Sequence, residues 1–292
     1  MRVLLTGASG FIGRHVLFAL LQQNIEVVTV GRTHFSKSFK HINLDILSAT
    51  DFAPLFREAQ ATHLLHLAWH TEHGEYWTSP LNLRWLEATV RLVEASCAAN
   101  IQHVIVAGSC AEYDWTSGYC REDVTPLNPT TLYGVAKDAT HNLVLAVCAK
   151  HQVPCAWTRI FWSYGDGESN KKLVPSLVDF FQGRRAPFGI IATVYRDFLH
   201  VSDIAQGFIK ILTQGASGVY NVSSGEPTRL SEVVTTLASL LGSDPEQILE
   251  LTMERRDEPK MLIGESFKLR ELGWKPILSL TQGLERDLRK EQ

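Results

Sequence analysis

Residues 2–13 read RVLLTGASGFIG, an apolar run followed by three glycines, Gly7, Gly10 and Gly13. A short apolar run that ends at glycine predicts a buried strand over residues 2–6. Apolar residues at helical spacing predict a helix over residues 10–23, directly after the turn. Glycines in such a turn let the backbone approach a pyrophosphate closely, and the first amides of the helix are free to bind it. The stretch therefore predicts a dinucleotide-binding turn that includes Phe11 and Ile12.

Strands and helices continue to alternate after this unit. Apolar and β-branched runs predict further strands at residues 25–30, 43–46, 63–68, 103–107 and 155–160. Amphipathic runs predict helices at residues 81–100 and 132–150. Such alternation predicts a parallel sheet with helices on both faces. We therefore expect an α/β fold with two parts: a Rossmann-type doubly wound parallel sheet over residues 1–165, rejoined by part of 190–215, and a smaller mixed α/β lobe over residues 166–292.

The bulk composition excludes several classes of function. The chain has 292 residues, a net charge of −3 and a pI of about 6.4, so it offers no electrostatic case for binding nucleic acid. Its five cysteines form no Cys-x-x-Cys pair, so we expect free thiols and no metal site. No window holds ~18 consecutive apolar residues, and the first apolar run is too short for a secretory signal. We therefore expect a cytoplasmic protein that does not enter a membrane.

A second group of polar residues follows the strand expected at residues 103–107. Ser109 comes just after that strand, and Tyr133 and Lys137 stand in YGVAK, one helical turn apart on one face. Ligands of such sheets lie beyond the carboxyl ends of the strands, so we expect Ser109 and Tyr133 to reach one carbonyl oxygen there. A lysine ammonium beside a phenol favours the phenolate, so we expect the pKa of Tyr133 to fall from about 10 toward neutrality. Such a phenol exchanges a proton with a carbonyl/alcohol pair, while a nicotinamide cofactor moves the hydride.

The residues after the second expected strand decide which dinucleotide fits. Turns that bind NAD place a carboxylate there for the ribose 2′-hydroxyl, but this chain has Gly31-Arg32-Thr33. Arg32 can pair with a 2′-phosphate, and Arg14, next to the last glycine, can add a second charge. We therefore favour NADP over NAD. Asp45, close to the third expected strand, either faces the adenine or belongs to a turn.

These residues resemble the extended short-chain dehydrogenase/reductases, in the NAD(P)-dependent epimerase/dehydratase branch that modifies nucleotide-sugars. Further matches follow in order along nearly the whole chain, at His66-Leu67-Ala68, Asn82, RIFWSYG (159–165), RDFLHVSD (196–203), YNV (220–222) and LGWKP (272–276). The resemblance implies a bound NAD(P) that Leu67 and Ala68 contact, with Ser109, Tyr133 and Lys137 as the catalytic trio. It also implies a homodimer that pairs the two long helices.

The resemblance further implies that the C-terminal lobe grips the diphosphate of a nucleotide-sugar. Arg196 is implied as a diphosphate ligand, together with Arg255 or Arg256, because a guanidinium fork suits that bidentate role. Lys171 or Lys172 either contributes to the same site or is a solvated surface charge.

Departures from the family pattern narrow the chemistry. The 4,6-dehydratases of the family carry an Asp-Glu pair directly after the residue that matches Ser109, whereas this chain has Cys110-Ala111 and no acid for a leaving hydroxyl. The cysteine two places after that serine, which the family's GDP-fucose-forming epimerase-reductases carry, is also missing. Glu112 either touches the substrate or caps a loop, and we favour the loop. Trp69 and His70, just past the fourth expected strand, are expected to line the sugar pocket.

Three functions remain open at this point. The first is an NADPH-dependent reductase of a keto sugar, with C4 of an NDP-4-keto-6-deoxyhexose as the expected carbon. The second is an NDP-sugar 4-epimerase that keeps NAD bound and returns the hydride to the same sugar. The third is a non-catalytic NADP-binding regulator, which the intact Tyr133 and Lys137 disfavour. The stereochemistry and the sugar depend on the shape of the pocket.

Overall fold

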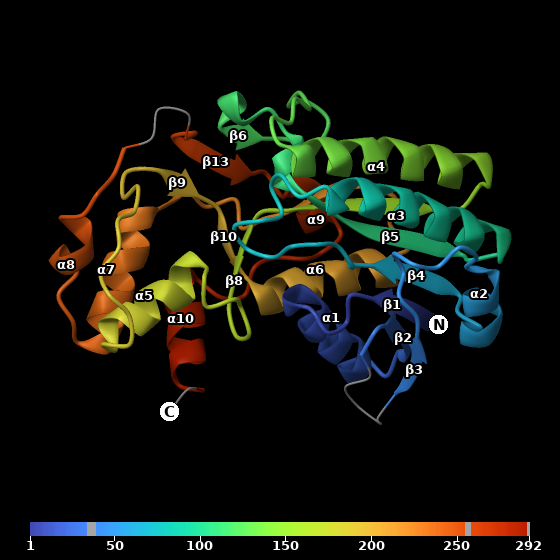
Figure 1. The fold of residues 1–292 in the computed structure, drawn as a ribbon, viewed down its shortest axis with the longest axis horizontal. Coiled ribbons are helices and arrows are strands. Elements are labelled where there is room, and N and C mark those ends of the chain that lie inside the picture. Colours follow the sequence, from blue (N-terminus) through green and yellow to red (C-terminus); the bar gives the residue numbers. More distant parts are fainter. Residues whose placement is uncertain (34–38, 255–257, 291–292) are drawn as a thin grey trace.

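The described part of the protein is built around a central parallel sheet (Figure 1). A computed structural model describes residues 1–33, 39–254 and 258–290. Within these residues the main sheet has seven strands in the order β11-β7-β5-β4-β1-β2-β3. They are β1 (Arg2–Thr6), β2 (Glu26–Gly31), β3 (Lys40–Asn43), β4 (His63–His66), β5 (His103–Ser109), β7 (Cys155–Ile160) and β11 (Gly218–Val222). The expected doubly wound fold is confirmed, because the direction of winding reverses between β1 and β4.

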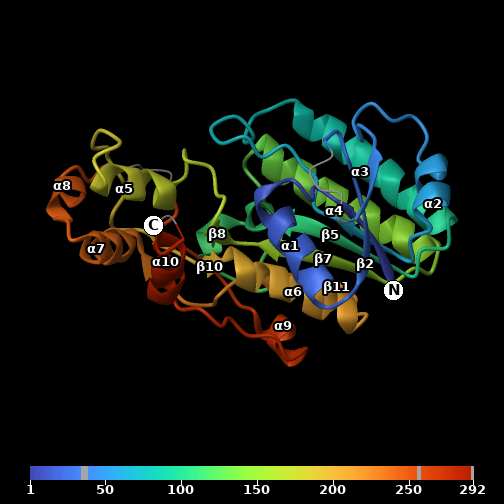
Figure 2. The same cartoon turned by 90° about the horizontal axis from the view of Figure 1, so that it is seen from below.

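Helices cover both faces of this sheet (Figure 2). One face carries α1 (Phe11–Gln22) and α6 (Val201–Thr213), and the other carries α2 (Ala53–Ala59), α3 (Leu81–Ala98) and α4 (Leu132–Lys150). Successive strand residues point to opposite faces, so Leu5 and Leu4 belong to two different apolar cores. The sheet is therefore buried on both sides, and ligands can reach it only at the strand ends.

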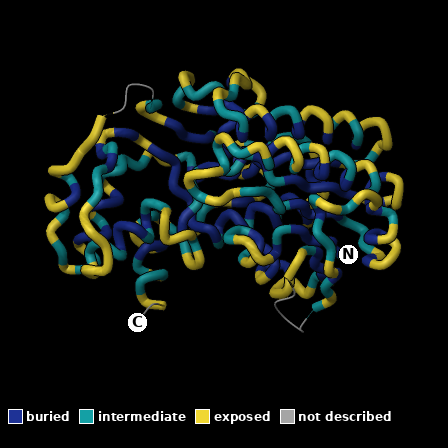
Figure 3. Tube along the Cα trace, viewed as in Figure 1, coloured by how far each residue is buried: buried dark blue, intermediate teal, exposed yellow. Residues whose placement is uncertain are grey.

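The remaining elements form a smaller lobe with a third apolar core. Its helices are α5 (Leu173–Phe181), α7 (Leu230–Leu241), α8 (Glu246–Leu249) and α10 (Leu280–Leu288). A two-stranded sheet pairs β8 (Trp162–Tyr164) with β10 (Phe198–His200), and a second sheet joins β12 (Thr228–Arg229), β9 (Tyr195–Arg196), β13 (Met261–Gly264) and β6 (Tyr119–Cys120). The short helix α9 (Phe267–Glu271) contacts β11. Figure 3 shows buried backbone in both parts, with exposed segments around their rims.

The chain crosses between the two parts more than once. After β7 it enters the lobe through β8, and it then returns through α6, which packs on α1, and through β11, which extends the main sheet beside β7. A domain boundary near Gly165, with a later segment that rejoins the first domain, stays a prediction.

Several local expectations differ from the structure. The third strand is Lys40–Asn43 instead of residues 43–46. The two-residue strands β6, β9 and β12 were not expected. Each of these segments is short and lies at the edge of its sheet or in a small sheet, so its conformation depends on tertiary pairing more than on local pattern.

The structure also bears on the cysteines, metals and membranes. All five cysteines are buried and free. Among the described residues, no His, Cys, Asp or Glu side chains cluster in a group of three or more that could hold a metal ion. Within the same residues, no helix has the length and apolar character needed to cross a bilayer.

Candidate active site

The glycine turn between β1 and α1 is packed too tightly for side chains at two of its three glycines. Gly7 has a φ of 72°, and a Cβ there would lie 2.7 Å from the amide nitrogen of Ala68. A Cβ at Gly13 would lie 1.9 Å from the carbonyl oxygen of Gly7. The turn is closed by the Gly10 amide, which donates to the Gly7 carbonyl at 2.9 Å. Gly7 and Gly13 are therefore required to bring α1 against β1 and the end of β4.

Gly10 has a different role, because it is exposed and a Cβ there would meet only the Gly7 carbonyl oxygen, at 3.2 Å. It is the N-cap of α1, and no side chain caps the first amides of this helix. Free amides at a helix N-terminus attract an anion, and the missing side chain leaves room for one. The turn thus has the space and the free amides that a dinucleotide pyrophosphate needs, and its binding role stays a prediction.

Thr6 connects this turn to the end of β4. Its buried hydroxyl accepts hydrogen bonds from the amides of Leu67 and Ala68, both at 3.1 Å, and lies 2.7 Å from His66 Nδ1. Burial lowers the pKa of His66 to about 3, so its ring is neutral and serves as a hydrogen-bonding strut. Leu67 and Ala68 are therefore held beside the glycine turn, where a cofactor role was predicted for them.

The residues predicted to select the dinucleotide lie in three places. Arg32 is exposed and directly follows β2, the strand that pairs with β1. Arg14 is exposed as well, but its guanidinium lies against Gly167, where a Cβ would be only 2.4 Å from Arg14 Nη1. The Asp45 carboxylate accepts from the amide of Leu47 at 3.1 Å and from the Ser48 hydroxyl at 2.9 Å, so it closes a turn. Of the two alternatives for Asp45, the turn is the one that its contacts support.

Tyr133 stands at the start of α4, against the end of β5. Thr131 caps the helix by accepting the amide of Gly134 at 3.1 Å, and the Tyr133 amide donates to the carbonyl of Trp77 at 3.1 Å. The Tyr133 side chain is buried, and Ser109, the last residue of β5, forms a hydrogen bond with it. The structure therefore brings Ser109 and Tyr133 together at the carboxyl edge of the sheet.

The expected lowering of the Tyr133 pKa was wrong. Burial raises the pKa of this phenol, and the hydrogen bond from Ser109 offsets only part of the rise. Lys137 does not contribute in the way that was expected, because its ammonium is directed to other partners. Nζ donates to the carbonyl of Ala107 at 2.8 Å and lies 3.7 Å from the centre of the Trp69 ring. The phenol is therefore protonated at neutral pH.

Lys137 is itself strongly perturbed. It is 3% exposed, and burial lowers its pKa to about 7, while the charge of Glu112 acts in the opposite direction. A desolvated ammonium with a pKa this close to neutrality changes its charge readily, which is a property of functional sites. The three residues predicted as catalytic thus share one buried region.

A loop after β4 packs aromatic rings around Tyr133. Tyr76 and Trp77 meet the Tyr133 ring edge-on, with centroid separations of 4.9 and 5.7 Å. Trp69 also meets Tyr133 edge-on at 6.5 Å, and its Nε1 donates to Asn82 at 2.9 Å. Trp69 thus lies beside Tyr133, and its place in the sugar pocket stays a prediction, whereas Tyr76 and Trp77 were missed. The only sequence signal for them was the pair of adjacent aromatic residues in a loop after a strand end.

His70 and the cations of the lobe side occupy less direct positions. His70 is half-buried, and its Nε2 lies 4.0 Å from the Glu75 carboxylate. Lys171 is exposed and pairs with Glu72 at 3.0 Å. Lys172 is half-buried instead, and its ammonium lies 5.5 Å from the centre of the Tyr76 ring. Of the two lysines, Lys172 is the one that contacts the aromatic group around Tyr133.

Arg196 is buried and already has strong partners. Its Nη1 donates to the carbonyls of Tyr195 and Pro259 at 2.7 and 2.9 Å, and its Nη2 pairs with the Glu258 carboxylate. The guanidinium also lies 5.1 Å from the centre of the Trp162 ring. A diphosphate would have to compete with Glu258 for this side chain, so the role predicted for Arg196 stays a prediction. Arg255 and Arg256 lie outside the described residues.

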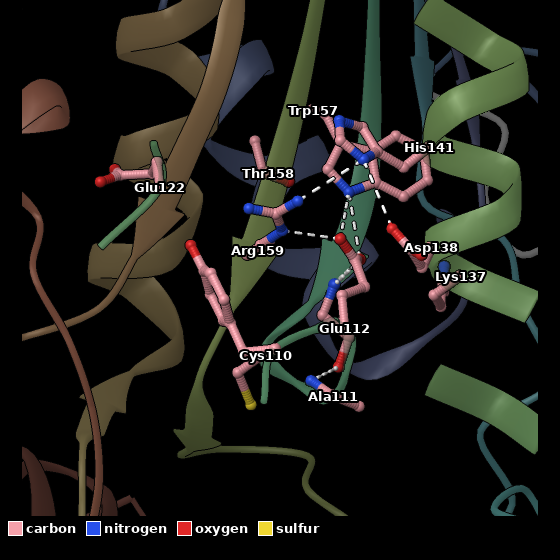
Figure 4. A network of polar contacts seen from close by, with 12 residues as sticks. Cys110, Ala111, Glu112, Glu122, Lys137, Asp138, His141, Trp157, Thr158 and Arg159 are labelled. Carbon is pink, nitrogen blue, oxygen red and sulfur yellow. Dashed lines mark hydrogen bonds and ion pairs between the residues drawn. The ribbon is translucent and has the colours of Figure 1, made fainter. Parts of the chain in front are cut away.

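Glu112 belongs to the short 3₁₀ helix η1 (Cys110–Glu112) that follows Ser109. Its side chain accepts the backbone amide of Ser109, and the Ser109 hydroxyl accepts the amide of Ala111 at 3.2 Å, so the two side chains cap the turn. The carboxylate is fully buried and pairs with Arg159 (Figure 4). The structure supports the loop-capping alternative for Glu112.

Comparisons with known proteins agree with this architecture. A family model described as "NAD dependent epimerase/dehydratase family" matches residues 3–223. A UDP-glucose 4-epimerase of Azospirillum brasilense is 27% identical over 316 residues, which cover 98% of this chain and 90% of the relative. A GDP-6-deoxy-D-mannose reductase of Pseudomonas aeruginosa is 25% identical over 304 residues, which cover 97% of this chain and 94% of the relative. Among solved structures, MoeE5 in complex with UDP-glucuronic acid and NAD is 29% identical, with a TM-score of 0.87 and 100% of both chains covered.

Proposed function

The chain belongs to the NAD dependent epimerase/dehydratase family, and from that premise we propose that it is an NADPH-dependent reductase of a nucleotide-activated keto sugar. We assign the reduced carbon as C4 of an NDP-4-keto-6-deoxyhexose. The observation that carries the proposal is the position of the Tyr133 phenol, which is buried at the start of α4 and hydrogen-bonded to Ser109; burial also raises its pKa, which suits a proton donor. A reductase needs a proton donor at its first chemical step, whereas a 4-epimerase begins with a base that removes a proton from the sugar.

The choice of NADPH rests on the end of β2. Arg32 follows this strand with its side chain exposed, where an NAD-binding turn would have a carboxylate. The nearby carboxylate of Asp45 is engaged by Leu47 and Ser48 of its own turn. A guanidinium can form a charge-assisted pair with a 2′-phosphate, so this edge of the site favours NADP.

The reaction can be assigned to the residues of the described site. When bound, NADPH supplies the hydride. Tyr133 donates its phenolic proton to the carbonyl oxygen of the sugar, and Ser109 donates a hydrogen bond to the same oxygen. We assign Lys137 to the ribose of the coenzyme, because its buried ammonium has N–H donors beyond the one that it gives to the Ala107 carbonyl. The aromatic rings of Tyr76 and Trp77 exclude water from this proton transfer.

The residues after Ser109 argue against dehydration. Cys110 and Ala111 stand where the family's dehydratases carry their acids, and burial raises the pKa of the Cys110 thiol so that it stays neutral. Glu112, the nearest carboxyl, is fully buried and bonded to Ser109, Trp157 and Arg159. No carboxyl of this turn is free to protonate a leaving hydroxyl.

A cofactor balance tests the proposal. The purified protein is incubated with a 4-keto-6-deoxy sugar of each nucleotide, and NADPH and NADH oxidation are followed by absorbance. We expect one NADPH consumed per sugar, with NADH at least about tenfold less efficient, since one charge-assisted contact is worth ~1.5–3 kcal/mol. If no 4-keto sugar oxidises NADPH, the reductase proposal fails.

A 4-epimerase is the second candidate, and two of the similar proteins support it. MoeE5 is described with UDP-glucuronic acid and NAD, and the Azospirillum brasilense relative is a UDP-glucose 4-epimerase. In this case the purified protein retains NAD, and turnover of the UDP-sugar needs no added coenzyme. Extraction of bound nucleotide after denaturation separates the two candidates.

The proposal includes a homodimer in the cytoplasm, where the five buried thiols stay reduced. Helices α3 and α4 pack side by side and expose Leu83, Val135 and Leu143 at 55%, 47% and 45%. An apolar surface on two adjacent helices suits a partner copy of the same surface. Sedimentation equilibrium is expected to give twice the chain mass, and a monomer at micromolar concentration would contradict the assignment.

A further inference from the structure

The network around Glu112 is built on a costly arrangement (Figure 4). Glu112 and Arg159 are 0% and 1% exposed, so both charges have lost their water. Three N–H donors converge on the carboxylate: the Ser109 amide at 2.7 Å, Trp157 Nε1 at 3.0 Å and Arg159 Nε at 2.7 Å. Such a buried pair gives little net stability compared with apolar residues of similar volume. Its presence beside the catalytic residues therefore calls for another explanation.

We propose that Glu112 is a positioning residue, which holds the backbone of Ser109 so that the Ser109 hydroxyl stays against Tyr133. Glu112 reaches neither the substrate nor the cofactor in this role. It acts through the Ser109 amide, to which it is bonded at 2.7 Å, and Arg159 and Trp157 fix the carboxylate from the neighbouring strand β7.

The end of β5 is shaped to admit the carboxylate. A Cβ at Gly108 would lie 2.6 Å from Glu112 Oε1 and 2.1 Å from Trp157 Nε1. Only glycine leaves space for both groups at this position, directly before Ser109. The strand end and the carboxylate are therefore fitted to each other.

The same turn also locates Tyr133. The start of α4 approaches η1 so closely that a Cβ at Gly134 would lie 2.3 Å from the carbonyl oxygen of Ala111. Further along α4, the His141 ring packs on Trp157 with centroids 5.2 Å apart. Glu112 thus bonds to β5 and β7 directly, while its neighbour Ala111 and its partner Trp157 contact α4. A displacement of this turn would separate Ser109 from Tyr133.

Other charged and titratable groups surround Glu112 and must be considered in any test. Arg159 contacts it from β7, Lys137 interacts with its charge from α4, and Cys110 lies on the same turn. The Arg159 guanidinium also lies 4.6 Å from the centre of the Tyr113 ring and 3.5 Å from His141 Nδ1. Removal of the Glu112 charge alone leaves Arg159 buried and unpaired, so a single variant can lose stability for that reason only.

The experiment therefore uses two variants and a matched control. Glu112→Gln keeps the side-chain volume but loses the charge, and Glu112→Gln/Arg159→Met removes both charges of the pair, so that no unpaired Arg159 is left. Glu122→Gln is the control, because the Glu122 carboxylate also accepts a backbone amide, that of Asn221 at 2.8 Å, at a different place. Kinetics, melting temperature and the amide signal of Ser109 in serine-labelled protein are measured for each.

We expect the double variant to fold and to melt near the native temperature, with kcat reduced about 100-fold and KM nearly unchanged, because a small misplacement of a catalytic group costs that much. The Ser109 amide proton is expected to shift upfield in both Glu112 variants, since its charge-assisted hydrogen bond is lost. Glu122→Gln is expected to leave this signal and kcat unchanged. A folded double variant that keeps native kcat would overturn the proposal, and so would an unmoved Ser109 signal.

The measurement of kcat depends on the proposed reductase activity, whereas the Ser109 amide signal can be measured whether or not the protein is a reductase. If the native protein reduces no keto sugar but the Ser109 amide still shifts in the Glu112 variants, the proposed function fails and the positioning of Ser109 stands. If the native protein is active and the double variant keeps native kcat, the positioning role fails and the reductase stands.

Discussion

The candidate site has two sides that differ in the residues that form them: the carboxyl edge of the main sheet, called the sheet side, and the part of the smaller lobe that faces it, called the lobe side. At the sheet side, the candidate site is formed by the glycine turn, by Ser109 at the end of β5 and by Tyr133 at the start of α4. At the lobe side, long charged side chains are paired with one another, as Arg196 is with Glu258 and Lys171 is with Glu72. The sheet side is thus ordered without a ligand, whereas a ligand that used Arg196 would have to displace Glu258.

The largest effect is expected at the sheet side, from loss of the proton donor. Tyr133→Phe should lower kcat about 10³- to 10⁴-fold, in the upper part of the range for general acid catalysis, and leave coenzyme affinity within about twofold. Stopped-flow reduction and coenzyme titration measure the two quantities. Tyr119→Phe, at a side chain that is 43% exposed, is the control and should be fully active. Comparable activity in both variants would remove Tyr133 from the mechanism.

The second expected effect concerns the buried charge of Lys137. Its folded-state pKa, about 7, lies below the unfolded value of 10.5, so the unfolded state binds more protons between these two values. The destabilisation is therefore complete below pH 7 and is relieved as the pH rises toward 10.5. Relative to Lys137→Met, the native protein should gain about 3 kcal/mol of unfolding free energy between pH 7 and 9.5.

Urea titrations at these two pH values test this linkage. The difference in unfolding free energy between the native protein and Lys137→Met removes the contributions of groups that titrate equally in both. A stability difference that stays constant with pH would mean that the Lys137 pKa is not lowered by folding.

The third expected effect separates two glycines of the same turn. Gly10→Ala should weaken coenzyme binding about 10- to 100-fold with little change in melting temperature, because the new Cβ meets only Gly7 and otherwise faces the anion. Gly13→Ala should instead destabilise the fold by about 2–4 kcal/mol, because its Cβ would overlap the Gly7 carbonyl. Calorimetric titration and thermal melting separate the two results. A Gly10→Ala protein with native coenzyme affinity would show that the anion does not bind at the turn.

The smallest effect is expected at the lobe side. Lys172→Met should raise KM for the nucleotide-sugar about tenfold, because one half-buried cation beside Tyr76 is lost. Lys171→Met should leave KM unchanged, because that side chain is exposed and pairs with Glu72 on the surface. Steady-state kinetics of the two variants measures both KM values. If both equal the native KM, neither lysine contacts the substrate.

This contrast also explains which features could be predicted from the sequence. The glycine turn, the parallel sheet and the group of Ser109, Tyr133 and Lys137 depend on local pattern and on the rule that strand ends gather at one edge. The pairing of Arg196 with Glu258 joins residues 62 positions apart, and the edge-on packing of Tyr76 on Tyr133 joins a loop to a helix. Contacts of this kind leave no periodic signal in the sequence.

The error on the Tyr133 pKa has the same origin. The spacing of Tyr133 and Lys137 places them on one helix face, but it does not show how deeply both are buried. Burial raises the pKa of the phenol and lowers that of the ammonium, so desolvation outweighs the pairing that was expected. Glu112 shows the converse, since its loop role was favoured from the sequence but its partners Trp157 and Arg159 were not foreseen.

The central claim is that Tyr133 protonates a keto sugar while external NADPH reduces it. Its most direct test is isotope transfer from NADPH that carries deuterium at the transferred position of C4 of its nicotinamide. We expect one deuterium at C4 of the product sugar for each NADP released. A product without deuterium, formed while coenzyme stays bound to the protein, would contradict it.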